Sequence, residues 1–379
     1  MQKQTVQSGA VVLSAAKDLH LSVAVIPLLL LALALPAHAQ DAKKPKAAKP
    51  PKTPSAGPAP VPPLFTSEQP LAVTFTANFG KLKSDRSETS PYRDATMSYT
   101  GADGKIVIVP IKAKTHGVWR LKHCQLPPIR LNISNKESKQ TLFYDLQKPK
   151  MVSVCKNQDE YEQFVLKEMQ LYRIYQTITP MSHRVRTLRV TYTDSASGKV
   201  EATRYAFVFE DPDELADRLG GQMTKVKGAT ADDMDADPLA VAFVFEYFIG
   251  NLDFSFNGLH NGEVVLKRDG SLAIPVAYDF DFSGAVNAPY ATVDPQFKSK
   301  RVIDRVFRGY CSIQGAYPAA IALFLQKKDA IYALYRDEVG KLLEPGIVKE
   351  QLSYFDEFYD QVKTPKDAEY VTRNCVGPR

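Results

Sequence analysis

The chain has 379 residues, of which 44% are hydrophobic and 24% are charged, so it is able to bury a sizeable core. This balance excludes a chain that is disordered throughout, and it excludes a polytopic membrane protein. The first 52 residues carry +5 of the formal net charge of +6, so the rest of the chain is close to neutral. A nucleic-acid-binding face is therefore not expected.

The N-terminal segment is typical of an export signal. An apolar run at residues 21–35 precedes the small-residue triplet Ala37-His38-Ala39, which predicts a signal peptide over residues 1–39 that is cut after Ala39. An uncleaved N-terminal anchor is the alternative. After cleavage we expect no transmembrane span and a secreted or periplasmic protein. Residues 40–64 are rich in Lys, Pro and Ala and predict an extended linker.

The sequence contains four cysteines. In an oxidising compartment an even number of cysteines favours disulfides, and four cysteines allow three pairings. We expect Cys124–Cys155 and Cys311–Cys375, because each pair joins near neighbours in the presumed fold. A structural zinc site is the alternative, since two histidines lie close to Cys124, but no CxxC or HxxxH spacing supports it.

The remaining chain, residues 65–379, changes character near residue 210. Short β-branched runs separated by Gly, Asp and Pro predict strands from residue 71 to residue 154. A helix with acids in its first turn and two further strands complete this β-rich part. Residues 211–379 are mostly helical, with a β-hairpin around Asp269-Gly270. The order predicts an α+β protein in two lobes, residues 65–210 and 211–379.

One face of the predicted helix after Asp159 carries an acid among apolar residues. Glu168 lies four residues after Phe164 and four before Tyr172, in the middle of an apolar stripe at helical spacing. A carboxylate that faces a core needs a cation or hydrogen bonds. Lys150 immediately precedes the apolar strand Met-Val-Ser-Val, so we predict a Lys150–Glu168 ion pair. The alternative is that Glu168 reaches solvent at the edge of the stripe.

A second acidic group lies in the helical part. Asp253 follows the apolar helix predicted over residues 237–250, and Asp279 and Asp281 are two residues apart in an apolar strand, hence on one face. Two such carboxylates repel unless a cation neutralises them, and Mg²⁺ with phosphate oxygens is the usual hard-ligand solution. The alternative is that the aspartates cap turns. The intervening residues that offer a further ligand are Asn257, His260 and Asn261.

In this order, the features resemble the CotH kinase-like family, the spore-coat protein H type, and its secreted bacterial relatives. The resemblance covers residues 71–315 and rests on the segments HGVWRLKHCQLPP, KPKMVSVC, LKEMQLYR, YAFVFED, IGNLDFSFNGLHN and YDFDFSGAVNAPY. It implies a two-lobed protein-kinase-like fold, with a β-rich N-lobe that carries one key helix and a mostly helical C-lobe with an embedded β-hairpin. The HRDLxxxxN and DFG motifs of ordinary kinases are absent.

The resemblance also implies a site for ATP and Mg²⁺ (or Mn²⁺), where the γ-phosphate passes to a hydroxyl on a protein. Lys150 would hold the α- and β-phosphates, Glu168 would orient Lys150, and Asp253 would accept the hydroxyl proton. The implied metal ligands are Asp279, Asp281 and Asn261. The other implied nucleotide-binding residues are Lys114, His116 and Gly117 in a phosphate-covering turn, and Glu210 in the segment against the adenine.

Two other functions stay open. His116 stands where the relatives have Arg, and Asn261 lies eight residues after Asp253 where ordinary kinases use five. These departures, together with the scarcity of ATP outside the cytoplasm, favour a kinase-shaped envelope protein that binds without turnover. A hydrolase that uses a metal or paired carboxylates needs no ATP, but no HExxH run accompanies the aspartates.

Overall fold

The computed structural model describes residues 60–297 and 299–377. The predicted signal peptide and most of the predicted linker lie outside the described residues. The described end of the linker already belongs to the folded part, because a 3₁₀ helix begins at Pro63 and the Leu64 side chain is buried in the barrel core. Within the described residues, no helix combines the length and the apolar character that a membrane crossing requires.

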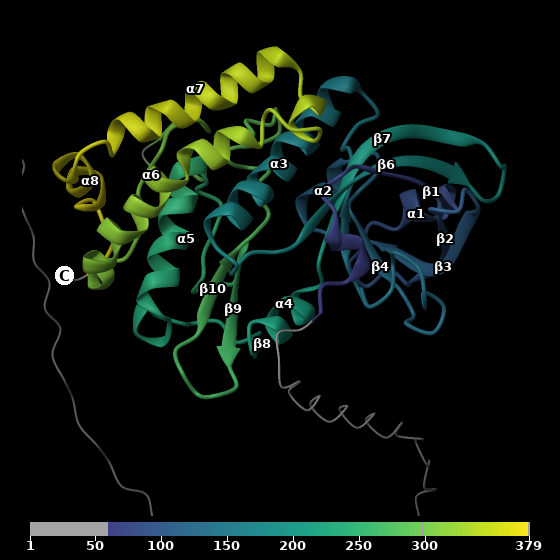
Figure 1. Ribbon diagram of the computed structural model, residues 1–379, viewed down its shortest axis with the longest axis horizontal. Helices are drawn as coiled ribbons and strands as arrows, with labels where there is room; N and C mark the ends of the chain where they lie inside the picture. The colour runs from purple at the N-terminus through teal and green to yellow at the C-terminus, as the bar shows by residue number, and fades with distance from the viewer. Residues whose placement is uncertain (1–59, 298, 378–379) are drawn as a thin grey trace, which may run out of the picture. The chain divides into compact units, whose positions relative to one another are not determined.

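Seven strands close into a mixed barrel, seen on the right of Figure 1. Their order around the barrel is β1-β2-β3-β4-β5-β7-β6. The bounds are β1 (Leu71–Ala77), β2 (Arg93–Thr100), β3 (Ile106–Thr115), β4 (Ile129–Asn132), β5 (Lys150–Val152), β6 (Val185–Asp194) and β7 (Val200–Phe209). Neighbouring strands are antiparallel except β1 and β6, whose parallel pairing from Leu71↔Leu188 to Ala77↔Asp194 closes the barrel.

Alternate residues of the strands fill the barrel interior. In β1 the side chains of Val73, Phe75 and Ala77 are buried and the residues between them are not, as a repeat of two residues requires. The Phe75 ring meets the rings of Phe79 and Tyr192 edge to face, at centroid distances of 5.8 and 6.3 Å. The interior is a packed apolar core, so polar side chains of the strands project to the outside.

Eight α-helices lie in the described part of the chain. They are α1 (Phe79–Ser84), α2 (Trp119–His123), α3 (Asp159–Ile178), α4 (Pro212–Arg218), α5 (Ala236–Ile249), α6 (Tyr317–Ala333), α7 (Pro345–Gln361) and α8 (Pro365–Thr372). Helix α3 runs between the barrel and the other large helices and packs on both β7 and α6 (Figure 1). Its first turn carries Asp159, Glu160 and Glu162, which favour a helix N-terminus.

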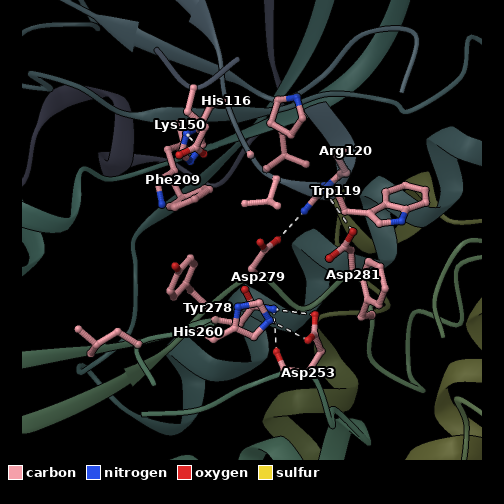
Figure 2. Close-up of a pocket in the computed structure, with 18 residues that line it drawn as sticks. His116, Trp119, Arg120, Lys150, Phe209, Asp253, His260, Tyr278, Asp279 and Asp281 are labelled. Atoms are coloured by element: carbon pink, nitrogen blue, oxygen red, sulfur yellow. Dashed lines mark hydrogen bonds and ion pairs between the residues drawn. The ribbon is translucent and has the colours of Figure 1, made fainter. Parts of the chain in front are cut away.

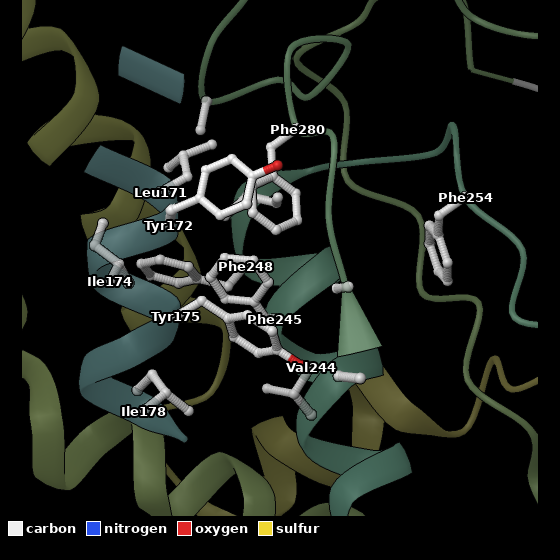
Figure 3. Close-up of a cluster of buried hydrophobic side chains, with 14 of the residues drawn as sticks. Leu171, Tyr172, Ile174, Tyr175, Ile178, Val244, Phe245, Phe248, Phe254 and Phe280 are labelled. Atoms are coloured by element: carbon white, nitrogen blue, oxygen red, sulfur yellow. The ribbon is translucent and has the colours of Figure 1, made fainter. Parts of the chain in front are cut away.

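An aromatic core joins α3 to α5 and to the segment after β10 (Figure 3). Tyr175 stacks on Phe245 with ring centroids 4.3 Å apart, and Tyr172 lies 4.6 Å from Phe280. Helix α5 begins at the Asp235 cap and ends at Gly250, whose left-handed backbone (φ 64°) lets the chain turn away from the helix. This core fixes α3 and the loop after α5, which both supply residues to the site below.

A second, three-stranded antiparallel sheet has the order β10-β9-β8. Its strands are β8 (Gly221–Met223), β9 (Gly262–Lys267) and β10 (Ile274–Ala277). The pairing of β9 with β10 confirms the hairpin predicted around Asp269-Gly270. The prediction that Asp279 and Asp281 share one strand face is wrong, because β10 ends at Ala277 and Asp279 has a left-handed backbone (φ 62°).

The predicted two-lobed protein-kinase-like fold is also wrong. The β-rich part is a closed seven-stranded mixed barrel, and eight helices and a separate small sheet accompany it in the described residues. The alternation of apolar residues predicts the strands themselves. It does not predict that β1 pairs in parallel with β6, a partner more than one hundred residues away, and this pairing is what closes the barrel.

The predicted cysteine pairing is confirmed, and the zinc alternative is not needed. Disulfides join Cys124 to Cys155 and Cys311 to Cys375. The first links the end of α2 to the segment after β5, and the second links the start of the 3₁₀ helix Cys311–Ala316 to the segment after α8. Disulfides of this kind are typical of proteins outside the reducing cytosol.

Candidate functional site

A pocket of about 470 Å³ opens between the outside of the barrel and the loops that follow α5 and β10 (Figure 2). The barrel side contributes the β3–α2 turn, β5 and the end of β7. The opposite side contributes the loop after α5 and the segment after β10. The residues that line the pocket are Glu88, His116, Gly117, Val118, Trp119, Arg120, Pro128, Lys150, Val152, Phe209, Asp253, Leu259, His260, Asn261, Tyr278, Asp279, Asp281 and Phe282.

Most of the residues predicted for the site line this one pocket. They are His116, Gly117, Lys150, Asp253, Asn261, Asp279 and Asp281. In Figure 2, Lys150, His116 and Arg120 lie on one side of the pocket, Asp253 and His260 lie on the other, and Asp279 lies between them. Segments that are far apart in the sequence therefore supply both basic and acidic side chains to one pocket.

Three of the predicted residues do not line the pocket: Glu168, which is buried on α3 and is described below, and Lys114 and Glu210. Lys114 projects from β3 outside the pocket, where its amine donates a hydrogen bond to the Glu88 carbonyl, 2.9 Å away, and lies over the Tyr92 ring. Glu210 is buried, and its carboxylate accepts hydrogen bonds from the Arg218 guanidinium and the Arg184 backbone N–H. Glu210 thus holds the chain between β7 and α4, and its side chain does not line the pocket.

Arg120 on α2 is the central cation of the site, and the sequence reasoning missed it. Its guanidinium lies 2.5 Å from Asp279 Oδ1, 3.2 Å from Glu168 Oε2 and 3.2 Å from Asp281 Oδ2. The side chains of Arg120, Glu168 and Asp281 are buried, whereas the Asp279 side chain is 40% exposed. Buried acids require a cation, but α2 has no apolar periodicity that would predict an inward-facing arginine.

The predicted Lys150–Glu168 ion pair is therefore wrong. Glu168 is buried on α3 and its partner is Arg120, which reaches it from the short helix α2. The Lys150 amine instead lies over the rings of Phe209 and Tyr278, 5.0 and 4.7 Å from their centroids. Burial lowers the pKa of Lys150, and among the neighbouring charges Glu263 opposes this most strongly.

The acids around Arg120 outnumber it. Burial raises the pKa of Glu168 and of Asp281, although the Arg120 guanidinium acts to lower both. If all three carboxylates are ionised, the cluster with Arg120 has a formal charge of −2. Asp281 Oδ2 is buried and accepts no well-formed hydrogen bond, in spite of its ion pair with Arg120.

These residues fit a divalent cation. One oxygen from each of Glu168, Asp279 and Asp281 lies within 4.8 Å of the others, and hard carboxylate oxygens are the ligands that Mg²⁺ and Mn²⁺ prefer. With all three carboxylates ionised, the excess charge equals that of one divalent ion, and the buried Asp281 Oδ2 has no well-formed hydrogen bond beyond its ion pair with Arg120. The Asn261 amide nitrogen donates to the backbone carbonyl and to the carboxylate of Asp253, and Asn261 as a metal ligand stays a prediction.

Asp253 is held on several sides. Its Oδ1 lies 2.8 Å from His260 Nε2, and its backbone N–H donates to Asn251 Oδ1. Arg308 donates to the carbonyls of Leu252 and Phe254, each 2.8 Å away, and so fixes the backbone on both sides of Asp253. The carboxylate is thereby presented to the pocket in a fixed orientation.

Asp279 is also anchored through its backbone. Its N–H donates to the buried Tyr172 hydroxyl at 2.9 Å, which connects the pocket to the aromatic core of α3. A left-handed conformation at a residue other than glycine is uncommon and concentrates at functional sites. The hydrogen bond from the Asp279 backbone to Tyr172 thus helps to hold the Asp279 carboxylate beside Arg120.

No protein-family model matches the chain, and no curated protein matches it. The resemblance to the CotH kinase-like family therefore remains a prediction that rests on the sequence segments alone.

Proposed function

We propose that this pocket binds a nucleoside triphosphate such as ATP with a divalent cation, and transfers a phosphoryl group to a hydroxyl acceptor on a protein. The observation that carries the proposal is that one pocket holds both signs of charge: Lys150, which has no carboxylate partner among the described residues, and the acids Asp253, Asp279 and Asp281, of which the last two contact Arg120. A phosphate chain is attracted to Lys150, and a cation bound to that chain is attracted to the acids.

The size and the lining of the pocket suit such a ligand. About 470 Å³ lies within the range of small-molecule sites, and the Phe209 and Tyr278 rings offer an apolar surface beside the Lys150 amine. A divalent cation would be held by Asp279 and Asp281, backed by Glu168, and would neutralise charge on the phosphate oxygens. Glu168 would orient Arg120 through their ion pair, whereas from the sequence we expected Glu168 to orient Lys150.

Asp253 is the residue placed to receive the acceptor's proton. Its backbone is fixed by Arg308, and its side chain is oriented by His260 and Asn261. Phosphoryl transfer depends chiefly on positioning and charge stabilisation, so a small set of rigidly held groups suffices. Asp253 accepts the hydroxyl proton as the hydroxyl oxygen attacks phosphorus and the bond from phosphorus to the leaving oxygen breaks.

The proposal is tested with the oxidised full chain, ATP labelled in its γ-phosphate, and Mg²⁺ or Mn²⁺. We expect label to enter protein, and we expect the Lys150→Met and Asp279→Asn variants to lose this labelling. Lys114→Met is the matched control, because Lys114 carries the same charge on the barrel but lies outside the pocket. Labelling that persists in the two pocket variants, or that is absent from the parent protein with both metals, contradicts the proposal.

A second function is binding without turnover, and Arg120 is the observation that favours it. The guanidinium already lies among the three carboxylates that would hold the metal, so it competes with a divalent cation. A protein with this function would show a higher melting temperature with ATP and Mg²⁺ but no transfer of label. A large separation between Lys150 and Asp279 would have favoured the hydrolase alternative. Both residues line the same pocket, so the structure does not favour it.

A further inference from the structure

Three basic residues form a row across neighbouring strands of the barrel. Lys114 of β3 is directly opposite Arg130 of β4, and Arg130 is directly opposite Lys150 of β5. Leu131 and Met151, the residues that follow the last two along their strands, are buried in the barrel core, so the row faces the outside. Like charges directly opposite each other destabilise a sheet unless something neutralises them.

Of the three residues only Lys150 lines the pocket, and the number of polar partners falls along the row from Lys114 to Lys150. Lys114 donates a hydrogen bond to the Glu88 carbonyl. Arg130 Nε is buried without a hydrogen-bond partner, and its guanidinium forms no ion pair with any acid of residues 60–297 or 299–377. Within the same ranges, the amine of Lys150 contacts aromatic rings but no carboxylate. Two adjacent cations are therefore left without a neutralising group.

The acids nearby are already engaged by other groups. Glu263 lies 2.9 Å from His183 Nε2, and the Asp211 carboxylate accepts a hydrogen bond from the Asp213 backbone N–H at the start of α4. These acids act on Arg130 and Lys150 only at a distance. The buried, unpaired Arg130 Nε carries a desolvation cost, which an anion bound beside Lys150, its strand neighbour in the pocket lining, would reduce.

We propose that Arg130 and Lys150 together form an oxyanion subsite that binds a phosphate group of the ligand. Arginine presents a planar fork of donors that matches phosphate oxygens, and lysine adds a point charge beside it. Burial, and after it the charges of Lys150 and Arg130, lower the pKa of His116 to about 3, so both cations lie near enough to act on this residue of the pocket lining. This subsite rests on the proposed function in one respect, that a phosphate ligand binds in the pocket. It does not depend on phosphoryl transfer, because inorganic pyrophosphate can bind without any transfer.

Calorimetric titration of the oxidised full chain with inorganic pyrophosphate, ATP and adenosine tests the subsite. We expect Arg130→Met and Lys150→Met each to weaken pyrophosphate and ATP about tenfold or more, since each removes a charge-assisted contact. Adenosine binding should be unchanged. Lys112→Met is the control, because Lys112 lies on β3 two residues from Lys114 but pairs with Asp94 at the surface. It should bind both phosphate ligands like the parent.

The melting temperature separates this role from a structural one. If Arg130 were structural, Arg130→Met would lower the melting temperature without ligand. We expect it to stay the same or rise, because a half-buried charge whose Nε has no hydrogen-bond partner is removed, while the stabilisation by pyrophosphate is lost. Rescue of pyrophosphate binding by Arg130→Lys, at least in part, is also expected.

The outcomes are distinguishable. Tighter binding of ATP than of pyrophosphate identifies the phosphates of a nucleotide as the ligand, and equal binding identifies a free polyphosphate; both support the subsite. Pyrophosphate that binds Arg130→Met as tightly as the parent overturns it. Loss of pyrophosphate binding in Arg130→Met, in a protein that transfers no label, would refute the proposed transfer and leave the subsite in place.

Discussion

The Arg120 Nη2 atom lies 2.5 Å from Asp279 Oδ1, so a side chain of the five-residue helix α2 reaches the segment that follows β10. The same guanidinium also pairs with Glu168 of α3. One arginine thus ties together three segments that are distant in the sequence. The stability of the pocket and its affinity for a cation should both depend on this residue.

Arg120→Met should reduce the free energy of unfolding by about 3–5 kcal/mol, because it leaves the buried carboxylates of Glu168 and Asp281, and the partly exposed Asp279, without their cation. Urea denaturation without divalent ions measures this loss. Millimolar Mg²⁺ should restore more stability to Arg120→Met than it adds to the parent, because the guanidinium no longer competes for the acids. Lys112→Met removes an exposed pair and should change stability by about 1 kcal/mol or less. Equal effects of the two substitutions would contradict the central position of Arg120.

Stability should fall as pH rises through the range where the buried acids of the cluster ionise. The pKa of Glu168 is raised in the folded protein, so the native state binds more protons than the unfolded state above the ordinary carboxyl pKa. The unfolding free energy therefore decreases with increasing pH until the folded-state pKa is passed. Glu168→Gln cannot ionise, and the difference between the parent and this variant isolates the effect. Urea denaturation between about pH 5 and about pH 8 should show the parent losing stability relative to Glu168→Gln.

Asp253→Asn should lower the rate of phosphoryl transfer by about a hundredfold or more, because the amide does not accept the acceptor's proton. The affinity for ATP should change little, since Asp253 faces the acceptor side of the proposed arrangement. Single-turnover kinetics and calorimetry measure the two quantities separately. Asp329→Asn, an exposed substitution on α6, is the control. A variant that transfers phosphate at the parent rate would remove Asp253 from the mechanism.

The two disulfides should differ in what their removal affects. Each is expected to contribute about 2–5 kcal/mol, and the Cys311–Cys375 bridge encloses the longer loop, 64 residues against 31. Replacing Cys311 and Cys375 by Ala should lower stability and leave ligand affinity unchanged. Replacing Cys124 and Cys155 should also weaken ATP binding, because Cys124 immediately follows the helix that carries Arg120. Chemical denaturation and calorimetry of both double variants measure stability and ATP affinity. Identical ATP affinity in the two variants would contradict this prediction.

Local patterns in the sequence predicted those features that depend on short stretches of chain. The hairpin of β9 and β10 follows from a turn dipeptide between apolar runs, and three acids of the pocket, Asp253, Asp279 and Asp281, follow from their place beside or within apolar segments. The partner of Glu168 was not predictable in this way. Arg120 lies in a short helix without an apolar stripe, and only the folded chain brings its guanidinium to α3.

The barrel shows the same division between local and distant information. The alternation in β1 predicts a strand with one buried face, and the structure has that strand. The same alternation does not predict which strand pairs with β1, because Leu188 is no more apolar than many other residues that could lie opposite Leu71. The closure of the whole sheet decides the pairing. The left-handed backbone of Asp279 is likewise imposed by its surroundings, including the Tyr172 hydroxyl, and not by residue type.

The parallel pairing of β1 with β6 has a consequence for how the protein is made. A chain that emerges N-terminus first presents β1 long before residues 185–194 are available to cover its second edge. During that interval the backbone N–H and C=O groups along this edge are open to strands of other molecules. Synthesis must therefore pass residue 194 before β1 is protected on both sides, and faster elongation or a holding chaperone should raise the yield of folded protein.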